Sequence, residues 1–174
     1  MPANPFCLLM RILTGLLFAA CLASAAFAQA ADSTYSEAEQ FVADLIETDG
    51  IHVVHFWAPW CGNSRNELKN GLSRVIDDNE DVSFTFVTVR NNGNDGAATL
   101  RNYNIAERVP RLAHPGRVSD GDRPVFLGHT IYWTPTTWIF HRNGRMAFAL
   151  NYGEVTPEFL QSLIDATRSE WHHD

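Results

Sequence analysis

Residues 56–64 read Phe56-Trp57-Ala58-Pro59-Trp60-Cys61-Gly62-Asn63-Ser64, and this stretch connects a strand-like segment to a helix-like one. Before it, Ile51 to Trp57 is rich in β-branched and aromatic residues, which predicts a buried central strand. After it, apolar residues recur at helical spacing, at Leu68, Leu72, Val75 and Ile76. We therefore expect Cys61 at the N-terminus of a helix, where free backbone N–H groups and the helix dipole favour the reactive thiolate.

The segments on either side of this junction alternate between helical and strand patterns. Ser36 and Glu39 form a capping box that begins a helix. The predicted core face of that helix holds Ala38, Phe41, Val42, Leu45 and Ile46. The helix after Cys61 is expected to close at Asp78-Asn79, followed by a strand over residues 82–89 and a short helix over residues 97–103.

The C-terminal third of the chain predicts a hairpin and a helix. Strands are expected at 136–141 and 146–152, joined by Arg142-Asn143-Gly144, because Asn-Gly is a strong hairpin signal. Thr156 and Pro157 begin a last helix, whose predicted core face holds Phe159, Leu160, Leu163 and Ile164. This order of elements indicates an α/β fold, with a central mixed β-sheet flanked by helices on both faces.

Residues 56–64 also resemble the active-site segment of thioredoxins and of the periplasmic TlpA/ResA-like branch of the thioredoxin superfamily. The resemblance continues through Tyr103-Asn104-Ile105, Thr134-Pro135-Thr136, and Asn143-Gly144 with Gly153 beyond. It covers nearly the whole chain after the first thirty residues, in order. It implies a thioredoxin fold and an activity in thiol–disulfide exchange.

The resemblance implies roles for individual residues. Cys61 would be the nucleophile, and Pro135 would be a cis-proline that faces it across the active site. The backbone of Thr134 would pair with an extended substrate peptide beside the sulfur. The other residues expected to contact substrate are Trp60, Gly62 and Asn63.

Ser64 stands where dithiol relatives carry their second cysteine. A serine hydroxyl cannot attack a mixed disulfide, so release of a client must come from an external thiol or from a second cysteine on the client. This favours an isomerase-like or glutathione-assisted exchange, with Ser64 as a hydrogen-bond donor to the thiolate. The alternatives are a protein that holds its clients, and a lineage in which the serine marks lost activity.

His55 lies six residues before Cys61, where thioredoxins commonly carry a buried aspartate. An imidazole there could relay the proton of an attacking thiol, because histidine titrates near neutral pH. Burial would favour the neutral form of the ring. The alternative interpretation of His55 is a core histidine with a satisfied hydrogen bond.

Residues 106–133 form an irregular stretch rich in proline and glycine, at a point where ordinary thioredoxins have only a few residues. We treat it as an insertion that emerges beside Pro135. Its cationic and imidazole side chains belong to Arg108, Arg111, His114, Arg117, Arg123 and His129. The stretch is either a cap or docking surface for a partner, or a solvated decoration without a role.

The first thirty residues indicate export. Arg11 precedes a short apolar run, and small residues follow up to Ala26-Phe27-Ala28, as in a cleavable secretory signal. We therefore expect a signal peptide over residues 1–28 and a periplasmic domain over residues 29–174. The alternatives are an uncleaved anchor, a lipoprotein attached at Cys21, and a cytoplasmic protein without a signal. Removal of the signal would leave Cys61 as a single thiol, without a structural disulfide.

Composition narrows the function further. The net charge is −7, and the chain has a single lysine and no basic stripe, so nucleic acid is not an expected partner. The histidines have no metal-ligand spacing with Cys61, so neither a metal nor a prosthetic cofactor is expected. The predicted function is monothiol exchange on protein or small-thiol disulfides, with glutathione or a membrane thiol donor as co-substrate. The alternative is a non-catalytic binding module that docks a partner or client protein.

Overall fold

A five-stranded sheet in the order β3-β2-β1-β6-β7 forms the centre of the domain. The structure is a computed structural model, and it describes residues 35–105, 107–115, 122–152 and 155–170. β1 (Ile51–Trp57) pairs in parallel with β2 (Val82–Thr88) and antiparallel with β6 (Thr136–Phe140). The outer strands are β3 (Arg111–Ala113), parallel to β2, and β7 (Met146–Asn151), antiparallel to β6.

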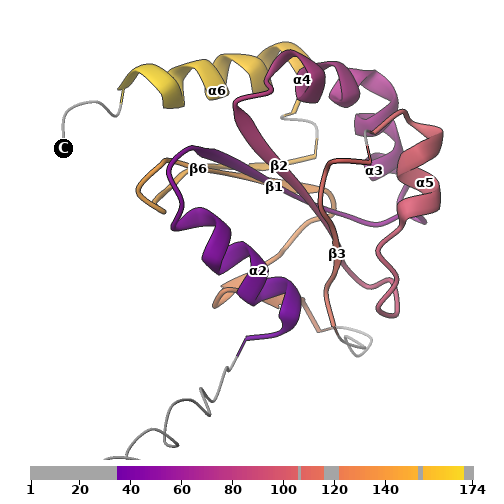
Figure 1. Ribbon diagram of the computed structural model, residues 1–174. Coiled ribbons are helices and arrows are strands. Elements are labelled where there is room, and N and C mark those ends of the chain that lie inside the picture. The colour runs from indigo at the N-terminus through magenta and orange to yellow at the C-terminus, as the bar shows by residue number, and fades with distance from the viewer. Residues whose placement is uncertain (1–34, 106, 116–121, 153–154, 171–174) are drawn as a thin grey trace, which may run out of the picture. The chain divides into compact units, whose positions relative to one another are not determined.

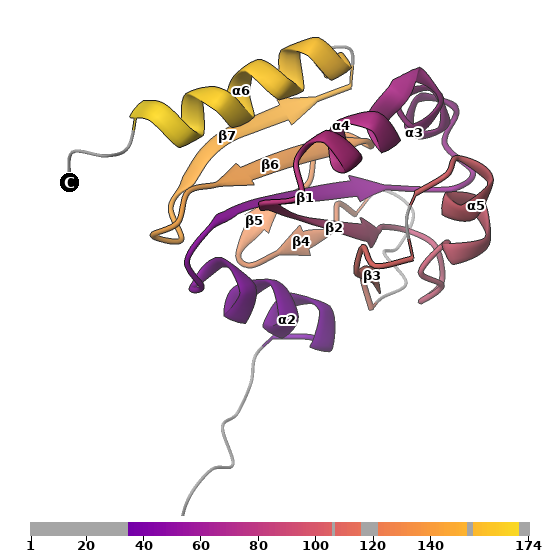
Figure 2. The ribbon, with the colours of Figure 1, turned by 45° about the horizontal axis from the view of Figure 1, so that its top comes forward.

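Helices cover both faces of this sheet, as Figures 1 and 2 show. One face carries α3 (Gly62–Glu67), the π-helical turn η2 (Leu68–Leu72), α4 (Ser73–Asp78) and α6 (Pro157–Glu170). α5 (Ala97–Asn102) adds Leu100 to the core on this face, and α2 (Glu37–Ile46) covers the other face. The predicted α/β fold with a mixed sheet flanked by helices is thus confirmed.

The side chains of β1 alternate between the two cores. Val53 and Trp57 belong to the core under α3, α4 and α6, whereas Val54 and Phe56 belong to the core under α2. Every residue of β1 is buried, which agrees with its near-continuous apolar sequence.

Two local sequence signals are confirmed in detail. The side chain of Ser36 accepts a hydrogen bond from the Glu39 backbone N–H, and the Glu39 carboxylate accepts one from the Ser36 N–H, as a capping box requires. At the predicted hairpin turn, Gly144 has φ 75° and its N–H donates to the His141 carbonyl. The left-handed backbone is the reason that this turn uses glycine.

Two predicted core residues are on the surface. Phe41 on α2 is 40% exposed and Phe159 on α6 is 44% exposed. On each helix the next residue, Val42 or Leu160, is fully buried instead. Because successive helical residues point about 100° apart, each phenylalanine lies at the edge of the buried stripe rather than inside it.

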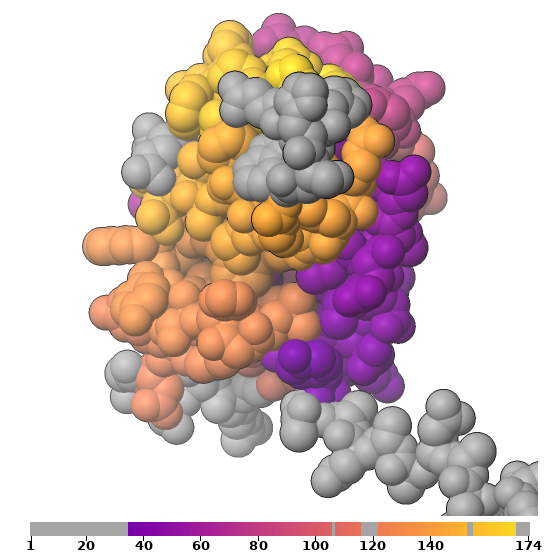
Figure 3. Space-filling model, turned by 90° about the vertical axis from the view of Figure 1, so that its left-hand side faces the viewer, coloured from indigo at the N-terminus to yellow at the C-terminus, as the bar shows by residue number. Residues whose placement is uncertain are grey.

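The described parts of the stretch at 106–133 contain short strands that the sequence did not predict. β3 extends the central sheet, and β4 (Val125–Phe126) pairs with β5 (His129–Thr130) in a small hairpin. Phe126 and Ile131 are buried in the same core as α2, and Figure 3 shows this segment packed beside that helix. Strands of two or three residues are too short to show a periodicity, which is why the sequence pattern missed them.

The helix after Cys61 ends at Asp78 as predicted, but it is not continuous. Gly71, inside η2, has φ 111°, which breaks the helical geometry between α3 and α4. An added side chain at Gly71 would meet Pro157 at the start of α6. The break therefore lies beside the first residue of α6.

The predicted signal peptide, residues 1–28, lies outside the described residues. Within the described part of the chain, no helix has both the length and the apolar character needed to cross a bilayer.

Gly96, which precedes α5, is expected to be intolerant of a side chain. Its φ is 71°, and a Cβ there would lie 2.5 Å from Cζ2 of the buried Trp57. Gly96→Ala should lower the free energy of unfolding by about 3 kcal/mol, because a strained backbone and a clash add together. Equilibrium urea unfolding measures this loss.

Gly93→Ala is the matched control for Gly96→Ala. Gly93 has φ 75°, but nothing lies within 4 Å of an added Cβ. It should lose only about 1 kcal/mol, from the backbone term alone. Equal losses in the two variants would contradict the packing of Gly96 against Trp57.

Candidate functional site

Cys61 lies at the N-cap of α3, directly after β1 and a short turn. Its backbone is extended, its carbonyl accepts from the Arg65 N–H at 3.1 Å, and its own N–H donates to the Ala58 carbonyl at 3.0 Å. No side chain caps the first turn of the helix. The thiol is partly exposed, so an incoming disulfide can reach the sulfur.

The loop before β6 is the part of the chain that faces the sulfur. Cys61 Sγ lies 3.4 Å from the Thr134 carbonyl oxygen and donates a hydrogen bond to it. The Thr134–Pro135 peptide bond is cis. Two observations explain why these residues meet: Phe56 of β1 pairs with Thr136 of β6, and the Thr136 hydroxyl donates to the Trp133 carbonyl at 2.9 Å.

Ser64 is fully buried one turn into α3. Its hydroxyl accepts a hydrogen bond from the Ala58 N–H at 3.2 Å. Among the described residues, no hydrogen bond joins Ser64 to Cys61, so the expected contact with the thiolate is absent. The serine instead ties the turn before Cys61 to the helix after it.

The other expected substrate-binding residues lie on the surface around the sulfur. Gly62 and Asn63 are exposed on the first turn of α3. Trp60 is 55% exposed, and its indole N–H donates to the Arg90 carbonyl at 3.0 Å. Trp57, by contrast, is fully buried and contacts Phe86 edge-on.

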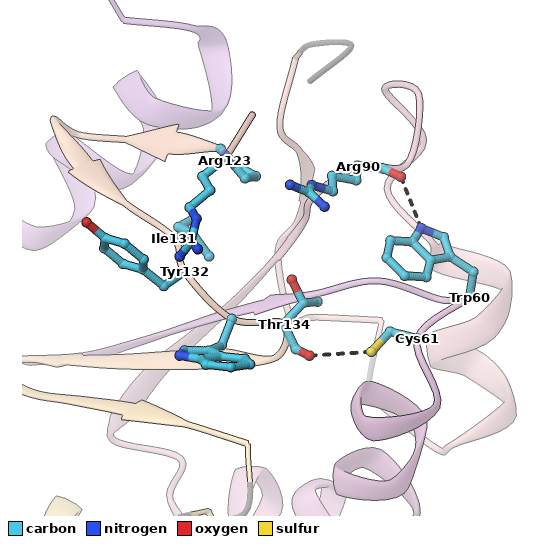
Figure 4. A pocket seen from close by; sticks show the side chains of 9 residues that line it. Trp60, Cys61, Arg90, Arg123, Ile131, Tyr132 and Thr134 are labelled. Carbon is cyan, nitrogen blue, oxygen red and sulfur yellow. Dashed lines mark hydrogen bonds between the residues drawn. The ribbon is translucent and has the colours of Figure 1, made fainter. Parts of the chain in front are cut away.

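A groove of about 360 Å³ opens beside the sulfur, and we call it the Cys61 groove. One wall comes from Trp60 and Cys61, and another from Arg90 in the loop after β2 (Figure 4). The third wall comes from the segment before the cis peptide bond, with Arg123, Tyr132, Trp133 and Thr134. The sequence analysis named Arg123 only as one of several cations in an insertion, and it missed Arg90.

His55 lies in the core between β1 and α3. Its Nδ1 is 2.9 Å from the Thr137 hydroxyl, and its Nε2 is 4.0 Å from a carboxylate oxygen of Glu67. Burial lowers the pKa of His55 to about 3, so the ring is neutral at physiological pH. The hydrogen-bonded core histidine, the second of our two interpretations, agrees with this environment.

Glu67 is the functional candidate that the sequence analysis missed. It is buried on α3, and burial raises the pKa of its carboxyl group to about 7. The sequence contained a signal for this burial. Glu67 is three residues after Ser64 and four before Gly71, and this spacing places it on the helix face that points to the core. A carboxylate on that face has to be either neutral or paired. The His55–Glu67 contact is therefore one between two uncharged groups from about pH 3 to about pH 7.

Other clusters of potential ligands are lacking around the site. Within the described residues, no group of three or more His, Cys, Asp or Glu side chains is placed to hold a metal ion. Cys61 is the only cysteine in that part of the chain.

Comparison with known proteins identifies the fold. No protein-family model and no curated protein matches the chain. A secreted disulfide oxidoreductase from Mycobacterium tuberculosis, homologous to E. coli DsbE, is 22% identical with a TM-score of 0.53, over 69% of this chain and 84% of that one. A DsbF homologue from Corynebacterium diphtheriae is 23% identical with a TM-score of 0.54, over 69% and 73% of the two chains.

A secreted thiol-disulfide isomerase from Corynebacterium glutamicum is also similar, at 18% identity and a TM-score of 0.51, over 71% of this chain and 75% of that one. These are thioredoxin-fold proteins, and this chain has the mixed central sheet flanked by helices of the α/β class. The chain therefore has a thioredoxin fold.

The buried pair His55 and Glu67 should give stability an unusual pH dependence. The pKa of His55 falls from 6.5 to about 3 on folding, so its contribution is lost as pH falls below 6.5. The pKa of Glu67 rises from 4.5 to about 7, so its contribution is present below pH 4.5 and lost as pH rises towards 7. Between pH 4.5 and 6.5 the two trends oppose each other.

Glu67→Gln removes one of these trends. The free energy of unfolding of the variant should rise by about 1 kcal/mol per pH unit between pH 4.5 and 6.5, whereas that of the wild type stays nearly level. Urea unfolding at several pH values measures both. Glu80→Gln, at an exposed position, should follow the wild type, and parallel curves for Glu67→Gln and wild type would count against a protonated Glu67.

Proposed function

We propose that this chain is an exported thiol–disulfide exchange protein that works through Cys61 alone. One observation carries the proposal: a partly exposed thiol at a helix N-cap lies 3.4 Å from the carbonyl before a cis-proline. A thioredoxin fold around this arrangement supports a thioredoxin-like role. Within the superfamily, the motifs at 56–64 and 134–136 favour the TlpA/ResA-like branch.

The reaction begins with the Cys61 thiolate attacking one sulfur of a substrate disulfide. A bond forms between Cys61 and that sulfur, the disulfide breaks, and the other sulfur leaves as a thiolate. The Thr134 backbone pairs with an extended substrate peptide beside the sulfur.

The second half of the reaction requires a thiol from outside the site. Ser64 has no sulfur with which to resolve a mixed disulfide. Its hydroxyl is buried and hydrogen-bonded to the Ala58 N–H, so it makes no contact with the thiolate either. A small thiol such as glutathione, a membrane thiol donor, or a second cysteine of the client attacks the mixed disulfide and frees Cys61. No prosthetic cofactor takes part. The substrates are protein or small-thiol disulfides.

Proton transfer near neutral pH falls to Glu67 rather than to His55. His55 has a pKa of about 3 and bonds to Thr137, so it remains neutral. Glu67 has a pKa of about 7 and lies less than two helical turns from Cys61 on the same helix. We therefore propose Glu67, rather than the predicted His55, as the buried group that exchanges a proton near neutral pH.

Export to the periplasm is part of the proposal. Its support is the signal-like segment at residues 1–28, together with the secreted location described for the Mycobacterium tuberculosis and Corynebacterium glutamicum proteins. N-terminal sequencing of the protein recovered from the periplasm is expected to begin at residue 29.

One observation favours a second function, that of a binding module. With Ser64 buried and no other cysteine in the described part of the chain, a mixed disulfide on Cys61 has no internal route to release. The chain would then hold a partner or client rather than turn it over. Turnover separates the two functions.

Cys61→Ala tests catalysis. Purified wild-type protein should restore activity to scrambled ribonuclease when glutathione is supplied, and Cys61→Ala should reduce this rate to that of glutathione alone, because no other described residue of the groove carries a sulfur. Cys61→Ser serves as the near-isosteric control and should be equally inactive. If Cys61→Ala performs as well as wild type, the enzymatic proposal is lost.

Ser64→Cys tests whether the missing sulfur limits turnover. The variant places a second thiol one turn from Cys61, where it can resolve mixed disulfides. Insulin reduction, followed by turbidity, should increase by about tenfold or more, in keeping with the change from an intermolecular to an intramolecular step. An unchanged rate would mean that the groove, rather than the serine, prevents turnover.

A further inference from the structure

Among the described residues that line the Cys61 groove, two carry guanidinium groups and none carries a carboxylate. Arg90 donates from its Nη2 to the Asp122 backbone carbonyl, while its own carbonyl is held by the Trp60 indole. The guanidinium carbon of Arg123 lies 4.5 Å from the centroid of the Tyr132 ring. Figure 4 shows both side chains reaching over the groove from opposite sides.

Neither arginine is paired with a carboxylate of a described residue, in contrast to three other surface arginines. Arg74, Arg108 and Arg168 each pair with an aspartate or glutamate. Within the described residues, Arg90 and Arg123 have only a carbonyl and an aromatic ring as partners. In a chain of net charge −7, two guanidinium groups without carboxylates make this groove a local site of positive charge.

The volume of the groove limits the size of the ligand that it can bind. Its volume of about 360 Å³ is at the lower end of the range for small-molecule sites. Trp60 and Trp133 present exposed rings at its rim, and the sulfur is at its floor. This space accommodates a thiol the size of a short peptide and brings its sulfur to Cys61.

We propose that the Cys61 groove binds a small thiol that carries carboxylates, with Arg90 and Arg123 holding the carboxylates while its sulfur lies against Cys61. The proposal rests on the function proposed above, in which Ser64 leaves the resolving step to an external thiol. Guanidinium groups suit this ligand because their paired N–H donors match a carboxylate. Arg90 and Arg123 are then specificity residues for the thiol co-substrate.

The exchange is balanced without a further oxidant or reductant. The Cys61 thiolate attacks a mixed disulfide between a client and the small thiol, forms a bond to the small-thiol sulfur and releases the client as a thiolate, which takes up a proton. A second small-thiol thiolate then attacks that sulfur and regenerates the Cys61 thiolate. Over the two steps, one mixed disulfide and one small thiol become one small-molecule disulfide and one client thiol.

Small disulfides of different charge test the proposal. Oxidised glutathione carries carboxylates, cystamine carries ammonium groups, and bis(2-hydroxyethyl) disulfide is neutral. The rate at which each forms a mixed disulfide on Cys61 is measured in the full chain, with the site located by peptide mass spectrometry. Wild type should prefer oxidised glutathione to cystamine, and the ratio of these rates should fall about tenfold in Arg90→Gln/Arg123→Gln.

Single variants and a matched control make the outcome specific. Arg90→Gln and Arg123→Gln should each give an intermediate ratio. Arg142→Gln removes the same charge at the exposed hairpin turn, at the end of β6 away from Thr136, and should keep the wild-type ratio.

Three results would contradict either the binding of a small thiol in the groove or the exchange function itself. An unchanged ratio in the double variant removes the proposal, while reaction of Cys61 with the neutral disulfide leaves the exchange function standing. If an acidic peptide disulfide loses rate in the double variant and oxidised glutathione does not, the occupant is a peptide rather than a small thiol. If wild-type Cys61 fails to react even with the neutral disulfide, the proposed exchange function itself is lost.

Discussion

The antiparallel pairing of β1 with β6 is the constraint on which the site depends. Phe56 lies opposite Thr136, so the chain leaving β1 and the chain entering β6 meet at the same edge of the sheet. That register brings Cys61 Sγ to 3.4 Å from the Thr134 carbonyl, although the two residues are far apart in sequence. A shift of one residue would turn every side chain of β6 to the opposite face and separate the two groups.

Much of this arrangement could be predicted from local sequence. The apolar run in β1, the capping box at Ser36 and the Asn143-Gly144 turn are each determined by residues close together in the chain, and each has a specific backbone preference. The positions of Cys61 and Pro135 followed from these elements together with the family resemblance. These features are reliable because local propensity and tertiary packing favour the same structure.

The features that escaped prediction are set by tertiary contacts. β3 to β5 are strands of two or three residues whose existence depends on β2 and α2 as partners. Phe41 and Phe159 are apolar at helical spacing, yet the neighbouring Val42 and Leu160 occupy the core. Arg90 joins the groove because a distant tryptophan holds its carbonyl, a contact without a sequence signature. The burial of Glu67 was visible only as a charge on an apolar stripe.

The hydrogen bond from the Ala58 N–H to the Ser64 hydroxyl has a consequence for the oxidised forms that the site can adopt. A two-cysteine site has two different oxidised forms. One is the internal disulfide, which carries no partner, and the other is the mixed disulfide with a bound partner. Here the residue at the position of the second cysteine is Ser64, and its hydrogen-bonded hydroxyl cannot form a disulfide with Cys61. In the exchange proposed for Cys61, oxidation of the site by a disulfide and attachment of a partner are therefore one event, and the mass added to the chain identifies the attached molecule.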